Sequence, residues 1–188
     1  MSKEIVRGSL QDIANNSRSA LSKAFLDCEA LILVDVSGSM AEKDCGYRSR
    51  FEVASDQLIC LQRDHPGKIG VIPWNTEVYF APEGLPDSPC GGTDLLRALN
   101  FIKPADNCGL RLIIISDGMA WETEKCLQLA ATFKTKLDTI YVGPKGKSGD
   151  QGREFMKELA RVSGGVSVSQ SVKEIGILNQ TITKLLKS

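Results

Sequence analysis

The stretch LILVDVSGSM at residues 31–40 decides the fold, because an apolar run within it ends on an aspartate. Residues 30–34 are apolar without interruption, which is typical of a central parallel strand buried on both faces. Asp35, Ser37 and Ser39 follow at alternate positions, with a glycine between the two serines. The pattern therefore predicts a buried strand whose carboxyl end presents oxygen atoms to a ligand.

The rest of the chain alternates between strand-like and helix-like apolar patterns. This alternation predicts a parallel sheet that helices cover on both faces. Residues 78–80 follow the Asn75-Thr76 turn too closely for a crossover connection, so they are expected to pair as an antiparallel edge strand. Further strands are expected at residues 68–74, 110–115, 139–142 and 166–168, and helices at 51–63, 93–102, 122–134, 153–161 and 172–186.

Residues 1–27 lie outside this alternating pattern and are expected to form a segment distinct from the main domain, residues 28–188. Ser9 is a suitable helix cap, and apolar residues recur after it at helical spacing. The polar run at residues 15–17 weakens the middle of this pattern. We therefore expect a helical segment that packs on the domain.

Charge and composition exclude several classes of partner. The 188 residues include 23 basic and 23 acidic side chains, so no net field directs the chain to nucleic acid or to a membrane surface. Its apolar runs are too short to span a bilayer, and its charged first residues do not resemble a signal peptide. We expect a cytoplasmic protein with six reduced cysteines. Cys45 and Cys90, in loops near one edge of the sheet, either form a redox-sensitive pair or remain two separate thiols.

Three separate segments are expected to bring oxygen ligands to one edge of the sheet. Asp35 and Asp117 follow predicted strands, and Thr93 lies where a long loop enters a helix. In parallel sheets, ligands bind outside the carboxyl ends of the strands. With Ser37 and Ser39, these residues form a set of carboxylates and hydroxyls, which favours Mg²⁺, Mn²⁺ or Ca²⁺ over zinc or copper. The two carboxylates only balance the charge of such an ion, so the site is suited to accept a further carboxylate from another molecule.

The motifs that supply these ligands also resemble those of a known family. DVSGS at residues 35–39, GGTD at 91–94 and ISDG at 115–118 are similar, in this order, to the von Willebrand factor A (vWA) domain with its metal-ion-dependent adhesion site. The resemblance implies an α/β fold, a Rossmann-like three-layer αβα sandwich. Its sheet would be mostly parallel and six-stranded, in the order 3-2-1-4-5-6, with one antiparallel edge strand.

The resemblance also implies a role for each of the five candidate residues. Ser37 and Ser39 would bind the ion directly, and Thr93 would bind it directly or through water. Asp35 and Asp117 would act largely through bridging waters. An Asp or Glu of a protein partner would then complete the coordination shell.

A non-enzymatic interaction module is the function that the resemblance favours. Intracellular, stand-alone members of this family often resemble adaptors that work with AAA+ ATPases of the MoxR or chelatase type. One alternative is a Mg²⁺-dependent phosphohydrolase, because haloacid-dehalogenase-type phosphatases also place an aspartate and Mg²⁺ at a strand end. Those enzymes need a second aspartate where this chain has Ser37. Another alternative is a metal-independent scaffold that binds through its helices and residues 1–27.

The remaining candidate features favour structural roles. Residues 145–148 (KGKS) are expected to form a solvated loop, because a phosphate-binding loop would need glycine in place of Tyr141. His65 precedes Pro-Gly, where a helix cap is expected, so a catalytic triad or a zinc site has little support. Trp74 and Trp121 are expected to be packing residues, with Trp121 exposed beside the site as a contact anchor as the alternative.

Overall fold

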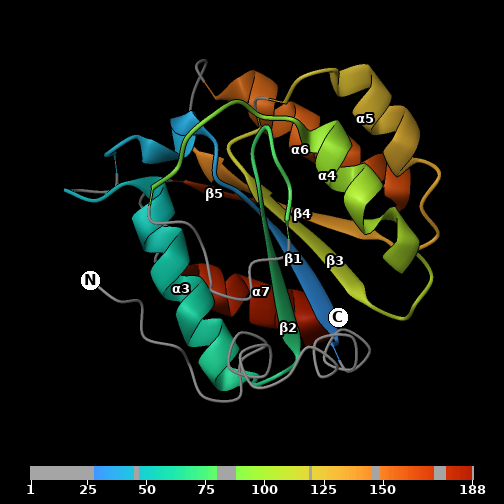
Figure 1. The fold of residues 1–188 in the computed structure, drawn as a ribbon, viewed down its shortest axis with the longest axis horizontal. Helices are drawn as coiled ribbons and strands as arrows, with labels where there is room; N and C mark the ends of the chain where they lie inside the picture. The colour runs from blue at the N-terminus through green and yellow to red at the C-terminus, as the bar shows by residue number, and fades with distance from the viewer. Residues whose placement is uncertain are drawn as a thin grey trace.

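A five-stranded parallel sheet forms the middle of the molecule (Figure 1). The computed structural model describes residues 28–44, 47–79, 88–118, 120–144, 149–171 and 177–187. The strands lie in the order β2-β1-β3-β4-β5. Their bounds are Ala30–Asp35 (β1), Ile69–Trp74 (β2), Arg111–Ser116 (β3), Leu137–Gly143 (β4) and Ser167–Ser171 (β5).

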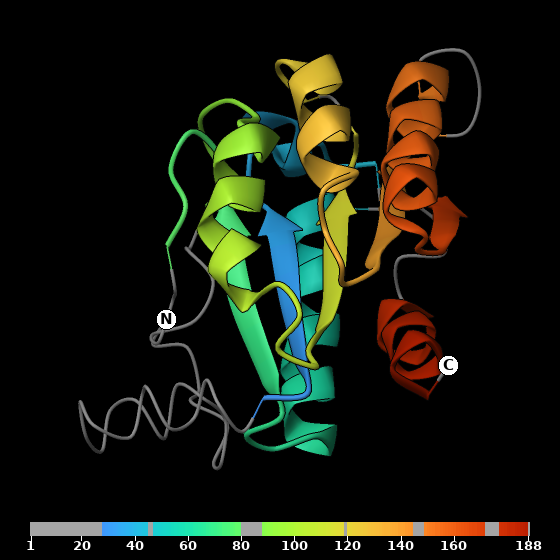
Figure 2. The ribbon, with the colours of Figure 1, turned by 90° about the vertical axis from the view of Figure 1, so that its right-hand side faces the viewer.

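Helices cover both faces of the sheet, which gives the three-layer α/β architecture. Figure 2 shows α4, α5 and α6 side by side in front of the sheet, with α3 behind it. The layer in front comprises α4 (Leu95–Ile102), α5 (Thr123–Ala130) and α6 (Asp150–Ser163). The other face carries α3 (Arg50–Asp64) and α7 (Leu178–Lys187). Two short 3₁₀ turns, η1 (Gly38–Ala41) and η2 (Lys103–Ala105), follow β1 and α4.

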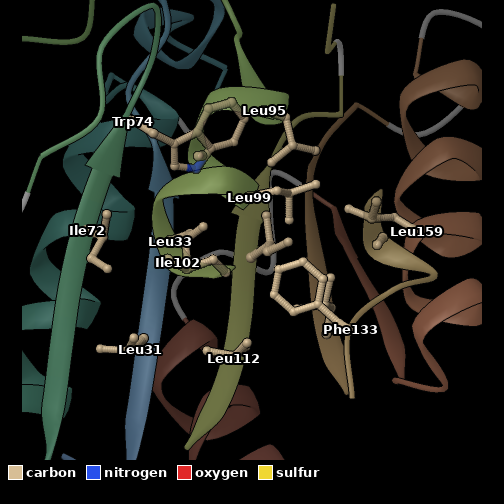
Figure 3. Packing of buried hydrophobic residues seen from close by; sticks show 14 of the residues in the cluster. Leu31, Leu33, Ile72, Trp74, Leu95, Leu99, Ile102, Leu112, Phe133 and Leu159 are labelled. Atoms are coloured by element: carbon tan, nitrogen blue, oxygen red, sulfur yellow. The ribbon is translucent and has the colours of Figure 1, made fainter. Parts of the chain in front are cut away.

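Alternation along the central strand explains why both layers are needed. Leu31 and Leu33 of β1 belong to the core under α4, α5 and α6, whereas Ile32 and Val34 belong to the core under α3 and α7. All residues of β1 are buried, as the uninterrupted apolar run predicts. Figure 3 shows the first core, where the Trp74 indole lies close to Leu95 of α4. The expected packing role of Trp74 is confirmed, because its side chain is completely buried.

The observed strand order agrees with the expected one, apart from the edge. Val78 makes only an isolated antiparallel bridge to Trp74. Residue 80 lies outside the described residues, so a sixth strand stays a prediction. The expected helix within residues 1–27 and the loop at residues 145–148 also lie outside the described part of the chain. None of the helices in that part combines the length and apolar composition needed to cross a membrane.

Helix boundaries follow recognisable capping residues. Ser49 begins α3 with a capping box, in which its side chain accepts from the Glu52 amide and its amide donates to the Glu52 carboxylate. Asp94 caps α4 by accepting a hydrogen bond of 3.0 Å from the Arg97 amide. His65 is the C-cap of α3, as expected. The helix expected at residues 122–134 is shorter than predicted: α5 ends at Ala130.

The shortening of α5 has a physical cause at Asp106. Its carboxylate accepts hydrogen bonds from the amides of Lys134, at 3.0 Å, and Thr135, at 2.8 Å, which hold the chain in a non-helical path. Lys103 completes the cluster at 2.9 Å. Burial by itself would raise the pKa of Asp106, but these backbone and lysine hydrogen bonds lower it well below its usual range.

Asp106→Asn tests whether this carboxylate stabilises the fold. At pH 7 the variant should lose about 1–2 kcal/mol of unfolding free energy, because a charge-assisted hydrogen-bond network is removed. A lowered folded-state pKa stabilises the protein above the unfolded-state value near 3.8, and this contribution is lost as the pH falls below it. Urea unfolding at pH 7 and pH 3 should therefore show the two proteins converging in acid. Glu154→Gln, at an exposed ion pair, is the control and should change little.

Candidate metal centre

The ends of two neighbouring strands define the candidate site. β1 and β3 are parallel partners with Val34 opposite Ile115, so Asp35 and the residues after Ser116 leave the sheet at the same edge. In Figure 2 the arrowheads of β1 and β3 point to the same end of the molecule. The expectation that Asp35 and Asp117 share one edge is therefore confirmed.

Asp35 is completely buried and links the two loops that follow these strands. Its Oδ1 accepts a hydrogen bond of 2.8 Å from the Ser37 amide, and its Oδ2 accepts one of 2.6 Å from the Ser116 hydroxyl. The Ser116 Oγ in turn accepts from the Gly118 amide at 2.9 Å. The carboxylate thus orients both the loop with the serines and the loop with Asp117.

Burial makes the charged form of Asp35 unfavourable without a cation. Desolvation is the largest effect, and with the nearby charge of Asp117 it raises the pKa of Asp35 to about 7. The hydrogen bonds from Ser116 and Ser37 oppose this rise but do not cancel it. Two buried carboxylates that repel one another form an arrangement that a divalent cation would stabilise.

The two serines lie together at the start of η1. Their Oγ atoms are 3.2 Å apart, and Ser37 is buried whereas Ser39 is partly exposed. Ser37 is the N-cap of η1, with an extended backbone, and Ser39 is the second residue of the turn, so the two hydroxyls form a pair directly after Asp35. Their role as oxygen ligands stays a prediction.

Thr93 is attached to both of these loops through backbone hydrogen bonds. Gly38 donates to the Gly91 carbonyl at 3.0 Å, which ties the segment before Thr93 to the serine loop. The Trp121 amide donates to the Thr93 carbonyl at 3.0 Å, which ties Thr93 to the segment after Asp117. The Thr93 side chain is buried between these connections. The structure therefore brings all three sequence motifs to one place.

Two glycines of the motifs are required by close packing. A Cβ atom on Gly92 would lie 2.2 Å from the Trp121 indole, so this glycine makes room for the ring. Gly118 has a φ of +86°, and a Cβ there would lie 2.4 Å from the Gly152 carbonyl oxygen at the start of α6. Trp121 was expected to be a packing residue, with exposure beside the site as the alternative, and the structure shows the alternative. Its side chain is 53% exposed beside the site, because it rests on the glycine loop at the surface.

Asp117 has a basic partner that the sequence did not indicate. Nη1 of Arg50 lies 3.1 Å from Oδ2 of Asp117, and both side chains are largely buried. Arg50 is 67 residues away in the chain, so no local spacing could show the contact. Ser116 was also missed as a site residue. Its place immediately before Asp117 at a strand end is a signal that could have identified it.

The residues present fit a hard divalent cation. Oδ1 of Asp117 is buried and has no hydrogen-bond partner among the described residues, which is a costly state for a carboxylate oxygen. The other candidate ligands are hydroxyls and a second carboxylate, the ligand types that Mg²⁺ and Mn²⁺ prefer. Within the described residues no group of three or more His, Cys, Asp or Glu is placed to hold a metal. A set with two carboxylates and several hydroxyls does not depend on such a group.

The described cysteines and an apolar cavity lie outside this set of ligands. Cys126 is buried, whereas Cys90 is exposed beside the glycine loop. Residue 45 is not described, so a pairing between Cys45 and Cys90 stays open. An apolar cavity of about 340 Å³ lies near the amino ends of β1 and β3, with Leu31 and Leu110 in its lining. It contains none of the candidate metal ligands.

Comparison with known proteins supports the fold. Neither the models of known protein families nor the curated protein sequences include a match to this chain. An aerotolerance-related membrane protein from Bacteroides fragilis, with multiple mutations to serines, is similar in structure at a TM-score of 0.62. It is 15% identical in sequence, and the match covers 85% of this chain and 98% of that one.

A second similar structure is that of the manganese-loaded TRAP protein of Plasmodium vivax. Its TM-score is 0.52 and its identity 14%, with 86% of this chain and 74% of that chain covered. At such identities the similarity concerns the fold alone. Both structures support the vWA fold that the three motifs predict.

The buried Asp35 should make the metal-free protein less stable as the pH rises. Its pKa is raised from 3.8 to about 7, so the protonated form stabilises the folded state at low pH, and this contribution is lost between those values. Asp35→Asn mimics the protonated side chain and should remove this dependence, a difference on the order of 3 kcal/mol. Urea unfolding in EDTA from pH 4.5 to 8 measures it. Parallel pH profiles for the two proteins would contradict the assignment.

Proposed function

We propose that this protein is a non-enzymatic interaction module that binds an acidic side chain of a protein partner through a divalent cation. Asp35, Ser37, Ser39, Thr93 and Asp117 would hold the ion, which is Mg²⁺ or, in its place, Mn²⁺ or Ca²⁺. When bound, the ion supplies an electrophilic position for a carboxylate. The protein's own residues would determine the shape of that position, limit its contact with solvent and balance the charge of the ion.

The observation that carries this proposal is the state of Asp117. One of its oxygens is paired with Arg50, and the other is buried without a partner among the described residues. A native protein rarely leaves a carboxylate oxygen in this state unless an ion or water completes its contacts. The oxygen belongs to the same site as the paired serine hydroxyls and the buried Asp35, which supports a cation there.

The position of Asp35 favours binding over catalysis. A phosphatase of the alternative type needs this aspartate as an attacking nucleophile, which must reach the substrate. Asp35 is completely buried, and each of its oxygens already accepts a hydrogen bond, from Ser37 or Ser116. The side chain is therefore arranged to hold the site together. The manganese in the similar TRAP structure adds support for a divalent ion in this fold.

The exposed surface beside the site suits a protein partner. Trp121 is half exposed next to Thr93, and large half-exposed aromatic side chains are frequent anchors in protein interfaces. We extend the proposal to an adaptor role in the cytoplasm, with an AAA+ ATPase or another assembly factor as the partner.

Titration with Mn²⁺ is the direct test of the metal site. The free ion gives an electron paramagnetic resonance signal that is lost on binding, so the full chain should show saturable binding of one ion. Asp117→Asn and Ser37→Ala should weaken the affinity at least about tenfold, because each removes an oxygen ligand or its charge. Asp56→Asn, at an exposed ion pair on α3, is the matched control and should bind like the wild type. Wild-type protein without saturable binding would refute the metal site.

Capture of a carboxylate is tested separately on the Mn²⁺-loaded protein. Bound Mn²⁺ accelerates the relaxation of water protons, and a carboxylate that displaces a coordinated water should reduce this effect. Acetate is the first probe, followed by peptides that contain a single Glu or its Gln counterpart. The Glu peptides should reduce the relaxation enhancement and the Gln peptides should not. An equal response to both would contradict carboxylate recognition.

A further inference from the structure

A buried arginine joins the candidate metal site to the loop that follows β1. Arg50 is the first residue of α3, and its side chain is only 9% exposed. Its Nη1 lies 3.1 Å from Asp117 Oδ2 and 3.4 Å from the Ser39 carbonyl oxygen. Its Nε and Nη2 face the Asp44 carboxylate in a two-pronged contact. The guanidinium therefore contacts two of the three segments that form the site.

In this position Arg50 compensates negative charge that a metal ion would otherwise compensate. Asp117 and Asp35 are buried carboxylates, and burial of a carboxylate charge is costly unless an opposite charge compensates it. Arg50 supplies one positive charge to Asp117 through Oδ2, and the partnerless Oδ1 remains for a second cation. A divalent ion that binds there is attracted by the carboxylates and repelled by the guanidinium.

We infer that Arg50 is an internal counter-ion that competes with the divalent cation for Asp117 and lowers the metal affinity of the site. The inference rests on the proposed metal-binding function and concerns its regulation. Arg50 stabilises the metal-free fold by neutralising Asp117, and the same charge makes loading weaker. The site is thereby kept assembled at low metal concentration and fills only as the ion concentration rises.

The contact with Asp44 explains how the guanidinium can release Asp117 when the ion binds. Asp44 lies in an exposed segment after η1, and its side chain is 33% exposed. Because the fork of Arg50 holds Asp44 through different nitrogens from the one that faces Asp117, weakening one contact leaves the other in place. Arg50 therefore does not become a buried unpaired charge when Asp117 engages the metal.

The test compares Arg50→Gln with Arg48→Gln in the full chain. Both substitutions remove one positive charge, but Arg48 is exposed and pairs with Asp56 on the surface. Competition predicts that Arg50→Gln binds Mn²⁺ at least about tenfold more tightly than the wild type, whereas Arg48→Gln changes the affinity less than about twofold. In EDTA, Arg50→Gln should also have a lower melting temperature, and Mn²⁺ should raise that temperature more than it does in the wild type.

Each result separates this inference from the proposed function. Wild-type binding with equal or weaker binding by a folded Arg50→Gln overturns the competition and leaves the metal site intact. If neither protein binds Mn²⁺, both the site and the competition fail. If Arg50→Gln is unfolded in EDTA, competition requires that Mn²⁺ restore the fold, as followed by circular dichroism. A variant that remains unfolded at saturating Mn²⁺ overturns the inference.

Discussion

The hydrogen bonds of the buried Asp35 are the constraint on which the rest of the site depends. One carboxylate oxygen is held by the Ser37 amide and the other by the Ser116 hydroxyl, so a single side chain connects the loops after two adjacent strands. Burial of a carboxylate is costly unless its lone pairs are satisfied and its charge is balanced. The fold satisfies the lone pairs internally, but it does not supply Asp35 with a direct basic partner among the described residues. This imbalance is the physical reason for proposing a cation site at this edge of the sheet.

In the proposed site, charge balance would be shared between a resident arginine and an exchangeable ion. Arg50 neutralises one oxygen of Asp117 and leaves the other for a ligand. A site organised in this way would remain folded without the metal, because the guanidinium would limit repulsion between the carboxylates. The loading of the ion can then be tuned by its concentration and by a partner that supplies a further carboxylate.

Periodicity and motif order predicted the main features of the fold. The continuous apolar run before Asp35 indicated a central strand, and the alternation of strands and helices indicated a covered parallel sheet. The end of α5 was placed too late because Asp106 binds the amides of residues 134 and 135 from a distant loop, a contact that no local pattern shows. Trp121 was expected to be a packing residue, with exposure beside the site as the alternative. A glycine loop on the surface supports its ring instead.

The sequence by itself determined which atoms are available at the site: two aspartates at strand ends, two serines at alternate positions and a threonine at a helix start. It did so because these features are local, and strand polarity brings the carboxyl ends of parallel strands to one edge. Only the tertiary structure decided how their charges are compensated. Arg50 reaches Asp117 across 67 positions, and Ser116 turns toward Asp35 across 81. Such contacts depend on which strands are neighbours and which helix covers them. The spacing of residues along the chain contains no information about either.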